Sequence, residues 1–176
     1  MSAAYILLKC IGKAVVKNVV NLFTFGVGGD ILVDAWEYWQ ETSKESERPA
    51  QVGAVAQLSP AELREEVARI VREEAARQSP EQQTQVAAYL EQVPATIRRS
   101  LRGSQGSTGK RAVAGTAFRK PEDLAPLLPA GLPRFKAGDR PLPGVDWELV
   151  ELLGVGGFGE VWKARNPHLE DRRAHV

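Results

Sequence analysis

Near its carboxyl end the chain carries a short glycine-rich turn between two segments that alternate apolar with charged residues. The turn contains Gly154, Gly156 and Gly159. Alternation with a period of two predicts strands over 145–153 and 160–165, because successive side chains of a strand point to opposite faces. Two strands joined by a tight turn form a hairpin, so the sequence excludes an all-helical fold.

The spacing of the glycines, G-x-G-x-x-G, occurs in two unrelated kinds of nucleotide site. In a dinucleotide-binding fold the turn opens a helix, and an acidic residue follows about 20 positions later. Here a strand pattern follows Gly159, and too few residues remain for a βαβ unit. Glycines lack a Cβ, so their backbone can approach phosphate oxygens closely and donate N–H groups to them. The pattern favours a phosphate cover made of two strands over a hairpin that binds no ligand.

The stretch from Trp147 to Arg165 resembles the start of the catalytic domain of bacterial serine/threonine protein kinases, whose G-x-G-x-x-G-x-V element lies over ATP. The resemblance implies that Leu153 and Val161 enclose the adenine and that Phe158 lies at the tip of the turn. The nucleotide-binding residues that it implies are Leu153, Gly154, Val155, Gly156, Gly157, Phe158, Gly159 and Val161.

The remaining parts of such an enzyme are missing from the sequence. Phosphoryl transfer by a kinase needs a lysine on the next strand, a catalytic aspartate, and an asparagine and an aspartate that hold Mg²⁺. Only fifteen residues follow Val161, and Lys163 lies too close to Val161, on the same strand, to replace the lysine. We therefore expect ATP as the ligand, no catalytic residue and no metal ligand in this chain. The sequence suggests a kinase interrupted by truncation, by a shifted reading frame near Glu170 or by the choice of fragment, and unable to catalyse phosphoryl transfer alone.

The charge and cysteine content exclude several other functions. The net charge is +1, although residues 98–143 sum to +7 and residues 45–92 to −4. The basic stretch has few aromatic residues, so we expect no nucleic-acid binding. Cys10 is the only cysteine, and His168 and His175 lie in the tail, which leaves no metal cage and no nucleophile–base pair. A single cysteine is typical of a reducing cytoplasm, the predicted location.

Residues 1–42 predict an apolar helical hairpin. Lys9, Lys13 and Lys17 recur every four residues and share one face of the first helix. That face can contact a membrane surface through residues 3–25, helped by anionic lipid, or it can pack against the acidic second helix. The sequence favours packing, and its longest uncharged run is too short to span a bilayer. The apolar face of the second helix consists of Ile31, Leu32, Ala35, Trp36 and Trp39.

Residues 43–58 are polar and predict a linker, and residues 59–102 predict amphipathic helices. Ser59 begins a capping box with proline at the first helical position, and Ser79 begins a similar motif. Pro94 is predicted to end one helix and begin a short one. The apolar faces are narrow, so each helix needs a partner surface, which either its neighbour or a second protein chain can supply.

Residues 103–144 predict a flexible, basic linker rich in proline and glycine. The run from Gly103 to Lys110 resembles a phosphate-binding loop, but its glycine spacing is wrong and no buried strand precedes it. A short helix is predicted from Pro121 to Leu124. Residues 132–141 resemble the approach to the catalytic domain in bacterial kinases and would lie along its small lobe.

The predicted fold class is therefore mainly α with a C-terminal β-hairpin. N-terminal helices and a flexible linker precede residues 145–176, which would begin the small lobe of a protein kinase. The expected function is that of the N-terminal part of an ATP-dependent serine/threonine kinase. The alternative is a non-catalytic helical interaction or regulatory protein that carries a kinase-derived hairpin as a relic.

Overall fold

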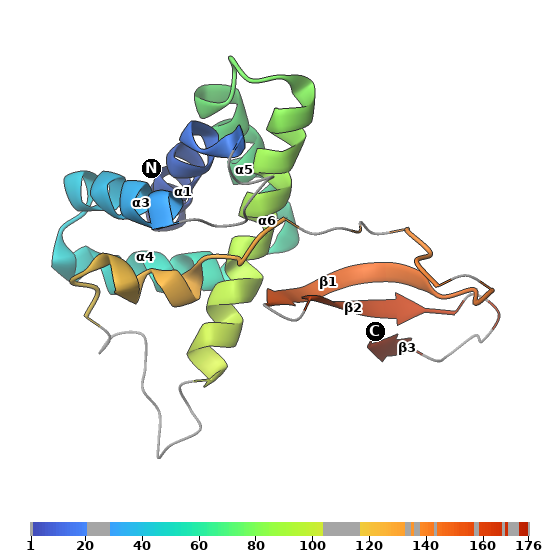
Figure 1. The fold of residues 1–176 in the computed structure, drawn as a ribbon. Coiled ribbons are helices and arrows are strands. Elements are labelled where there is room, and N and C mark those ends of the chain that lie inside the picture. Colours follow the sequence, from blue (N-terminus) through green and yellow to red (C-terminus); the bar gives the residue numbers. More distant parts are fainter. Residues whose placement is uncertain are drawn as a thin grey trace.

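The structure is a computed structural model that describes residues 2–20, 29–103, 117–132, 135, 138–142, 144–156, 159–166, 168 and 173–175. A helical body lies on one side and a small antiparallel sheet on the other (Figure 1), which confirms the predicted fold class. The helical elements are α1 (Ala3–Lys17), α3 (Gly29–Thr42), η1 (Glu45–Glu47), α4 (Arg48–Gln57), α5 (Pro60–Glu74), α6 (Pro80–Gly103), η3 (Pro121–Asp123) and η4 (Ala125–Leu127). The strands are β1 (Glu148–Gly156), β2 (Gly159–Arg165) and β3 (Arg173–His175).

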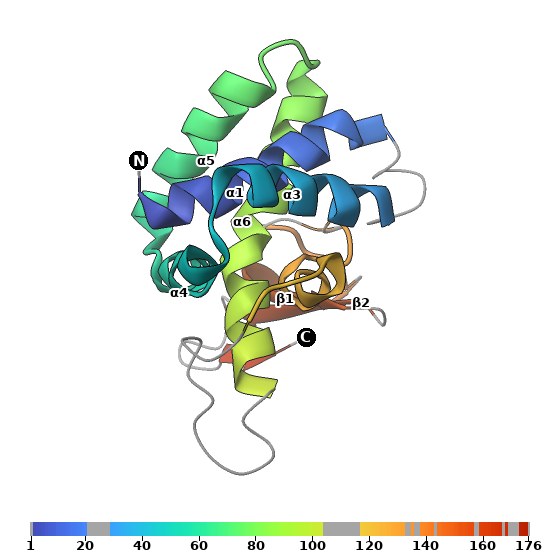
Figure 2. The ribbon, with the colours of Figure 1, turned by 90° about the vertical axis from the view of Figure 1, so that its left-hand side faces the viewer.

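Helix α1 lies at the centre of the helical body and contacts α3, α4, α5 and α6 (Figure 2). Its lysines occupy one stripe, so most of its remaining surface is apolar and buried. Burial of one large aliphatic side chain contributes about 1.5–3 kcal/mol, so the buried side chains of α1 contribute strongly to the core. Its large buried side chains are Tyr5, Leu7, Leu8, Ile11 and Val15.

The lysines at the two ends of this stripe form ion pairs with neighbouring helices. Lys9 Nζ lies 2.7 Å from a carboxylate oxygen of Glu73 in α5, and Lys17 Nζ lies 2.7 Å from one of Asp34 in α3. The predicted packing of the first helix against the second is confirmed. Contact of residues 3–25 with a membrane surface stays a prediction, and none of the helices in the described ranges is long and apolar enough to cross a membrane.

Residues 43–58 form η1 and α4 rather than a linker, so that prediction is wrong. Val52 and Val55 of α4 are buried in the main core. Gln51 is also buried, and its Oε1 accepts a hydrogen bond from Trp39 Nε1 at 2.5 Å. Because Gln51 is polar, it interrupts the spacing of apolar residues from which a helix is predicted. Its hydrogen-bond partner, Trp39, lies in another helix, so the local sequence does not reveal that Gln51 is buried.

Helix α6 is continuous from Pro80 to Gly103, so the predicted break at Pro94 is wrong. Proline removes one hydrogen bond from a helix and usually kinks it. Here Val93 and Ile97 are both fully buried, and packing on either side of the proline keeps the segment helical.

The apolar faces of α5 and α6 are covered within the chain. Helix α5 contacts α1 and α6, and α6 also contacts α1 and α4. The segments 1–42 and 59–102, which the sequence treats as separate, therefore share one core. Association of 59–102 with a protein partner or a second copy stays a prediction.

Residues 117–132, called the strap below, pack on the helical body instead of forming part of a flexible linker. Phe118, Leu124 and Leu127 are buried in the main core. Arg48 donates from Nη1 to the Phe118 carbonyl at 2.7 Å, and the Tyr89 hydroxyl donates to the Pro129 carbonyl at 3.0 Å. The linker prediction is thus wrong for the strap, although η3 confirms the predicted short helix. Residues 104–116, with the Gly/Ser run, lie outside the described residues.

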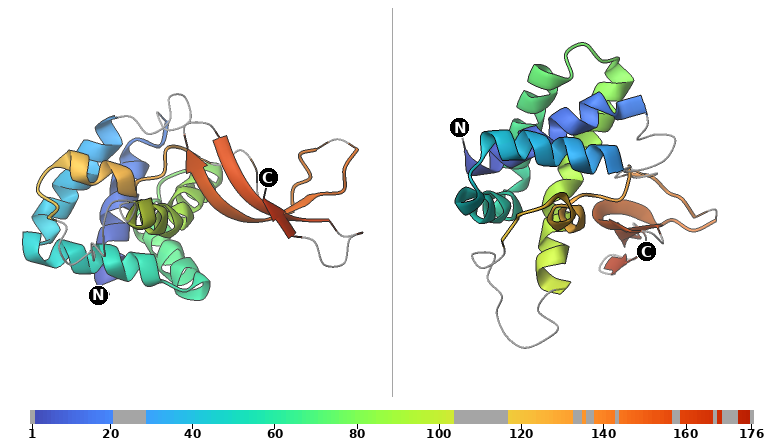
Figure 3. Two further views of the ribbon diagram at one scale, coloured as in Figure 1. Left: turned by 90° about the horizontal axis from the view of Figure 1, so that it is seen from below. Right: turned by 60° about the vertical axis from the view of Figure 1, so that its left-hand side comes forward.

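The sheet has the order β1-β2-β3, with antiparallel neighbours. Leu149, Trp162 and Ala164 are buried on one face and form a second, small core with Trp147 and Leu152 packed against it. Helix α6 contacts β1, and the hairpin extends away from the helical body (Figure 3). Strand β3 was not predicted, because it has only three residues and pairs solely with the end of β2.

Candidate functional site

The glycine-rich turn joins two paired strands, as predicted. Gly156 pairs with Gly159, and Val155 pairs with Glu160. No helix leaves the turn, since β2 continues to Arg165. Gly157 and Phe158, both implied nucleotide-binding residues, lie outside the described residues.

An irregularity in the ladder separates the turn from the base of the hairpin. Leu152 pairs with Trp162 and Gly154 pairs with Val161, so Leu153 is an extra residue on β1. Such a bulge twists a strand and redirects its side chains. The residue pairs between the bulge and the turn are therefore rotated relative to the buried pairs at the base of the hairpin. The Leu153 side chain is half-buried.

Val161 is more exposed than Leu153, the other residue that the kinase resemblance places at the adenine. Its exposed fraction is 48%, whereas Trp162 and Ala164 on the same strand are buried. Alternation puts Val161 on the face opposite to these two residues. The site therefore has one apolar face packed inside the protein and one open face that carries Val161.

Charged residues flank Val161 on the open face toward the base of the hairpin. Lys163 Nζ lies 3.4 Å from Glu151, and Arg165 Nη2 lies 2.8 Å from Glu148, both across the β1–β2 ladder. Lys163 thus pairs with a carboxylate of its own hairpin, and its unsuitability as the phosphate-binding lysine stays a prediction.

Glu160, the first residue after the third glycine, holds neighbouring groups in place. Its Oε2 accepts a hydrogen bond from Trp162 Nε1 at 2.8 Å and one from the Phe135 amide at 3.4 Å. The sequence offered a signal for the first contact, because residues two apart on a strand share a face. It offered none for Phe135, which is 25 residues away.

A short segment before the hairpin pairs with the base of β1. Gly138 N–H donates to the Leu149 carbonyl at 2.7 Å, and Leu149 N–H donates to the Asp139 carbonyl at 2.9 Å. Gly138 has a φ of +94°, a conformation that favours glycine. Residues 132–141 are predicted to lie along the small lobe, and these two bonds place residues 138–139 along β1.

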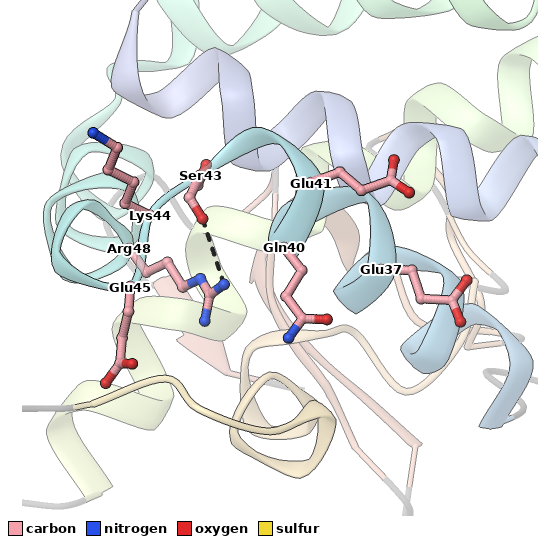
Figure 4. Close-up of a pocket in the computed structure, with 7 residues that line it drawn as sticks. All are labelled: Glu37, Gln40, Glu41, Ser43, Lys44, Glu45 and Arg48. Carbon is pink, nitrogen blue, oxygen red and sulfur yellow. Dashed lines mark hydrogen bonds between the residues drawn. The ribbon is translucent and has the colours of Figure 1, made fainter.

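A second region of interest is an open pocket of about 590 Å³ between α3 and α4 (Figure 4). Arg48 lines it, donates from Nη2 to the Ser43 carbonyl at 3.4 Å, and lies 4.7 Å from the centre of the Trp36 ring. Figure 4 shows the Glu37 and Glu41 side chains extending to one side of the pocket and Glu45 lying apart from them. Arg48 therefore joins α3, α4 and the strap.

The described residues contain no group of three or more histidine, cysteine, aspartate or glutamate side chains placed to hold a metal ion. Comparison with protein-family models, with curated proteins and with solved structures finds no match for this chain.

Proposed function

We propose that the chain is the N-terminal part of a cytoplasmic, bacterial-type serine/threonine protein kinase, and that its hairpin covers the phosphates of ATP. The observation that carries the proposal is the pairing of Gly156 with Gly159 between two antiparallel strands. A dinucleotide-binding turn would open a helix at this point. The glycine-rich hairpin is the form used over ATP phosphates in kinases.

Each part of the hairpin has a distinct role in this proposal. Backbone N–H groups of the turn donate to phosphate oxygens, and the absence of Cβ atoms lets the backbone approach them. Val161, with Leu153, supplies apolar surface for the adenine. ATP brings the transferable γ-phosphoryl group together with Mg²⁺, and the proposal assigns no Mg²⁺ ligand to this chain.

The helical body and the segment before the hairpin both contact β1. Helix α6 contacts β1, and the Gly138–Asp139 segment pairs with Leu149. Trp162 and Ala164 are buried while Val161 is open. This arrangement orders the hairpin and keeps its Val161 face accessible.

The proposal is tested by measuring the affinity of the chain for Mg-ATP by calorimetry. A hairpin that offers only part of a site is expected to bind with a Kd on the order of 1 mM. Val161→Asp places a negative charge beside the nucleotide and should weaken binding roughly tenfold. Val150→Asp is the matched control, because Val150 is a similarly exposed valine of β1 outside the implied site, and it should leave the affinity unchanged.

The competing function is that of a helical interaction protein with a relic hairpin. It predicts that Mg-ATP does not bind, or that Val161→Asp and Val150→Asp affect binding equally. Phosphotransfer to a protein substrate by this chain alone would contradict the expectation that it lacks the catalytic residues.

A further inference from the structure

A second, smaller cavity of about 220 Å³ lies between α1 and α3, far along the chain from the hairpin. We call it the α1–α3 pocket. Tyr5 and Ile6 of α1 and Tyr38 of α3 supply much of its apolar wall. Drug-sized ligands occupy pockets of roughly 300–1,000 Å³, so this pocket suits a smaller molecule.

Cys10 contributes a neutral part of the wall. Its Sγ lies 3.3 Å from the Thr42 hydroxyl, and burial raises the pKa of the thiol. The sulfur is therefore protonated near neutral pH and behaves as a small apolar group.

Three charged side chains line the same cavity, those of Lys9, Lys13 and Glu41. Lys9 and Lys17 each pair with a carboxylate, whereas Lys13, between them on the same stripe, contacts only the face of the Tyr38 ring, at 5.5 Å from its centre. Glu41 also lines the cavity. Within the described part of the chain, neither Lys13 nor Glu41 has an ion pair, with each other or with another residue.

We propose that the α1–α3 pocket binds a free apolar α-amino acid, with its side chain in the cavity, its carboxylate at Lys13 and its ammonium group at Glu41. A simple anion would be attracted by Lys13 but repelled by Glu41. A simple cation would be attracted by Glu41 but repelled by Lys13. Only a zwitterion with an apolar body complements both charges and the apolar wall. This site is independent of the nucleotide site proposed for the hairpin.

Three probes of similar shape separate these contributions: L-phenylalanine, 3-phenylpropionate, which lacks the ammonium group, and 2-phenylethylamine, which lacks the carboxylate. Amide shifts in two-dimensional NMR spectra of the full chain would give both the affinity and the location. L-Phenylalanine should bind most tightly and shift amides of Cys10, Tyr38 and Thr42. Each single-charge probe should bind about fivefold more weakly, the size expected for the loss of one charged contact.

Substitutions of Lys13 and Glu41 should have opposite effects on the affinities of the two single-charge probes. Lys13→Met should weaken binding of L-phenylalanine and 3-phenylpropionate about fivefold and should strengthen binding of 2-phenylethylamine, because it removes a repulsion between two cations. Glu41→Gln should weaken binding of L-phenylalanine and 2-phenylethylamine and should strengthen binding of 3-phenylpropionate, because it removes a repulsion between two carboxylates. Lys163→Met, on the distant hairpin, removes the same charge as Lys13→Met and should change none of the three.

Glu41 is exposed, so Glu41→Gln should fold even if Lys13→Met does not. The proposal is overturned if L-phenylalanine at about 10 mM shifts no amide of the pocket. It is also overturned if all three probes bind equally, or if Glu41→Gln leaves the order of the probes unchanged. Failure here is distinguishable from failure of the kinase proposal, since Val161→Asp should leave phenylalanine binding intact.

Discussion

Gly12 of α1 and Gly53 of α4 both lie in packed helices, but only Gly12 has a neighbouring side chain close to where a Cβ would lie. A Cβ built on Gly12 would lie 2.7 Å from Ile70 Cγ2, whereas one built on Gly53 meets no atom within 4 Å. Close packing makes an added methyl group costly at the first position only. The contact between α1 and α5 therefore requires glycine at Gly12, and α4 has no such requirement at Gly53.

Gly12→Ala is expected to lower the free energy of unfolding by about 1–2 kcal/mol, because overpacking outweighs the higher helix propensity of alanine. Gly53→Ala, the matched control, should raise it by about 0.5–1 kcal/mol through propensity alone. Denaturant unfolding measures both. Equal effects of the two substitutions would contradict the close approach of α1 to α5 at Gly12.

Glu73 makes stability depend on pH in the acidic range. Its hydrogen bond from Lys9, followed by one from the Tyr5 hydroxyl, lowers the pKa of its carboxyl from about 4.5 to about 2. A carboxyl with a depressed folded-state pKa stabilises the fold above the unfolded value and loses that effect as it becomes protonated. Its contribution should therefore be complete above pH 4.5 and fall away between about pH 4.5 and pH 2.

Unfolding measured across this pH window should show the loss in the wild type and a smaller slope in Glu73→Gln, which cannot titrate at this position. Parallel loss of stability in the two proteins would show that Glu73 is not the group responsible.

Residues whose partners are close in sequence were predictable, and those with distant partners were not. The cap at Ser59 follows from its spacing to Glu62, whose N–H donates to Ser59 Oγ at 3.3 Å. Burial of Arg48 was not predictable, because it depends on a carbonyl 70 residues away. The turn glycines and Val161 could be identified from a local pattern, whereas the contact of Glu160 with Phe135 could not.

At the scale of elements, the strap and the segment after it connect the helical body to the sheet. Phe118 lies against Trp39, with ring centres 5.5 Å apart, and Gly138 pairs with Leu149 of β1. Six prolines between 121 and 143 made this region look like a linker. Phe118, Leu124 and Leu127 are nevertheless buried, since the helices provide a surface that the local sequence does not reveal.

Gly138→Ala is expected to weaken the pairing with β1, because alanine is strained by about 1 kcal/mol at a φ of +94°. The Leu149 N–H, which donates to the Asp139 carbonyl, should then exchange with solvent about fivefold faster. Gly131→Ala is the matched control, since nothing lies within 4 Å of the added Cβ and its φ is ordinary. Identical exchange of Leu149 in both variants would refute this connection.

At the scale of the whole molecule, the described residues form two cores of very different size. The main core unites α1, α3, α4, α5 and α6 with the strap, and the second consists of Leu149, Trp162 and Ala164 with two partly buried neighbours. A hairpin with so little buried area is marginally stable unless other elements cover it. The sequence did not predict a single large core, because the apolar faces that build it are spread over four predicted segments.

Amide exchange should therefore show a hierarchy of opening free energies. The amide of Trp162 should exchange through openings that cost less free energy than those exposing Leu8 or Ile11 of α1. Native-state hydrogen exchange at increasing denaturant measures the difference. Equal opening free energies at these positions would mean that the hairpin and the helical body unfold as one cooperative unit.

The central claim, that the glycine-rich hairpin covers a nucleoside triphosphate, is tested most directly by residue-resolved NMR during titration with Mg-ATP. Amides from Leu153 to Val161 should shift, Mg-ADP should produce smaller shifts, and the amides of α1 should stay in place. Shifts confined to the helical body, or none at about 10 mM Mg-ATP, would contradict it.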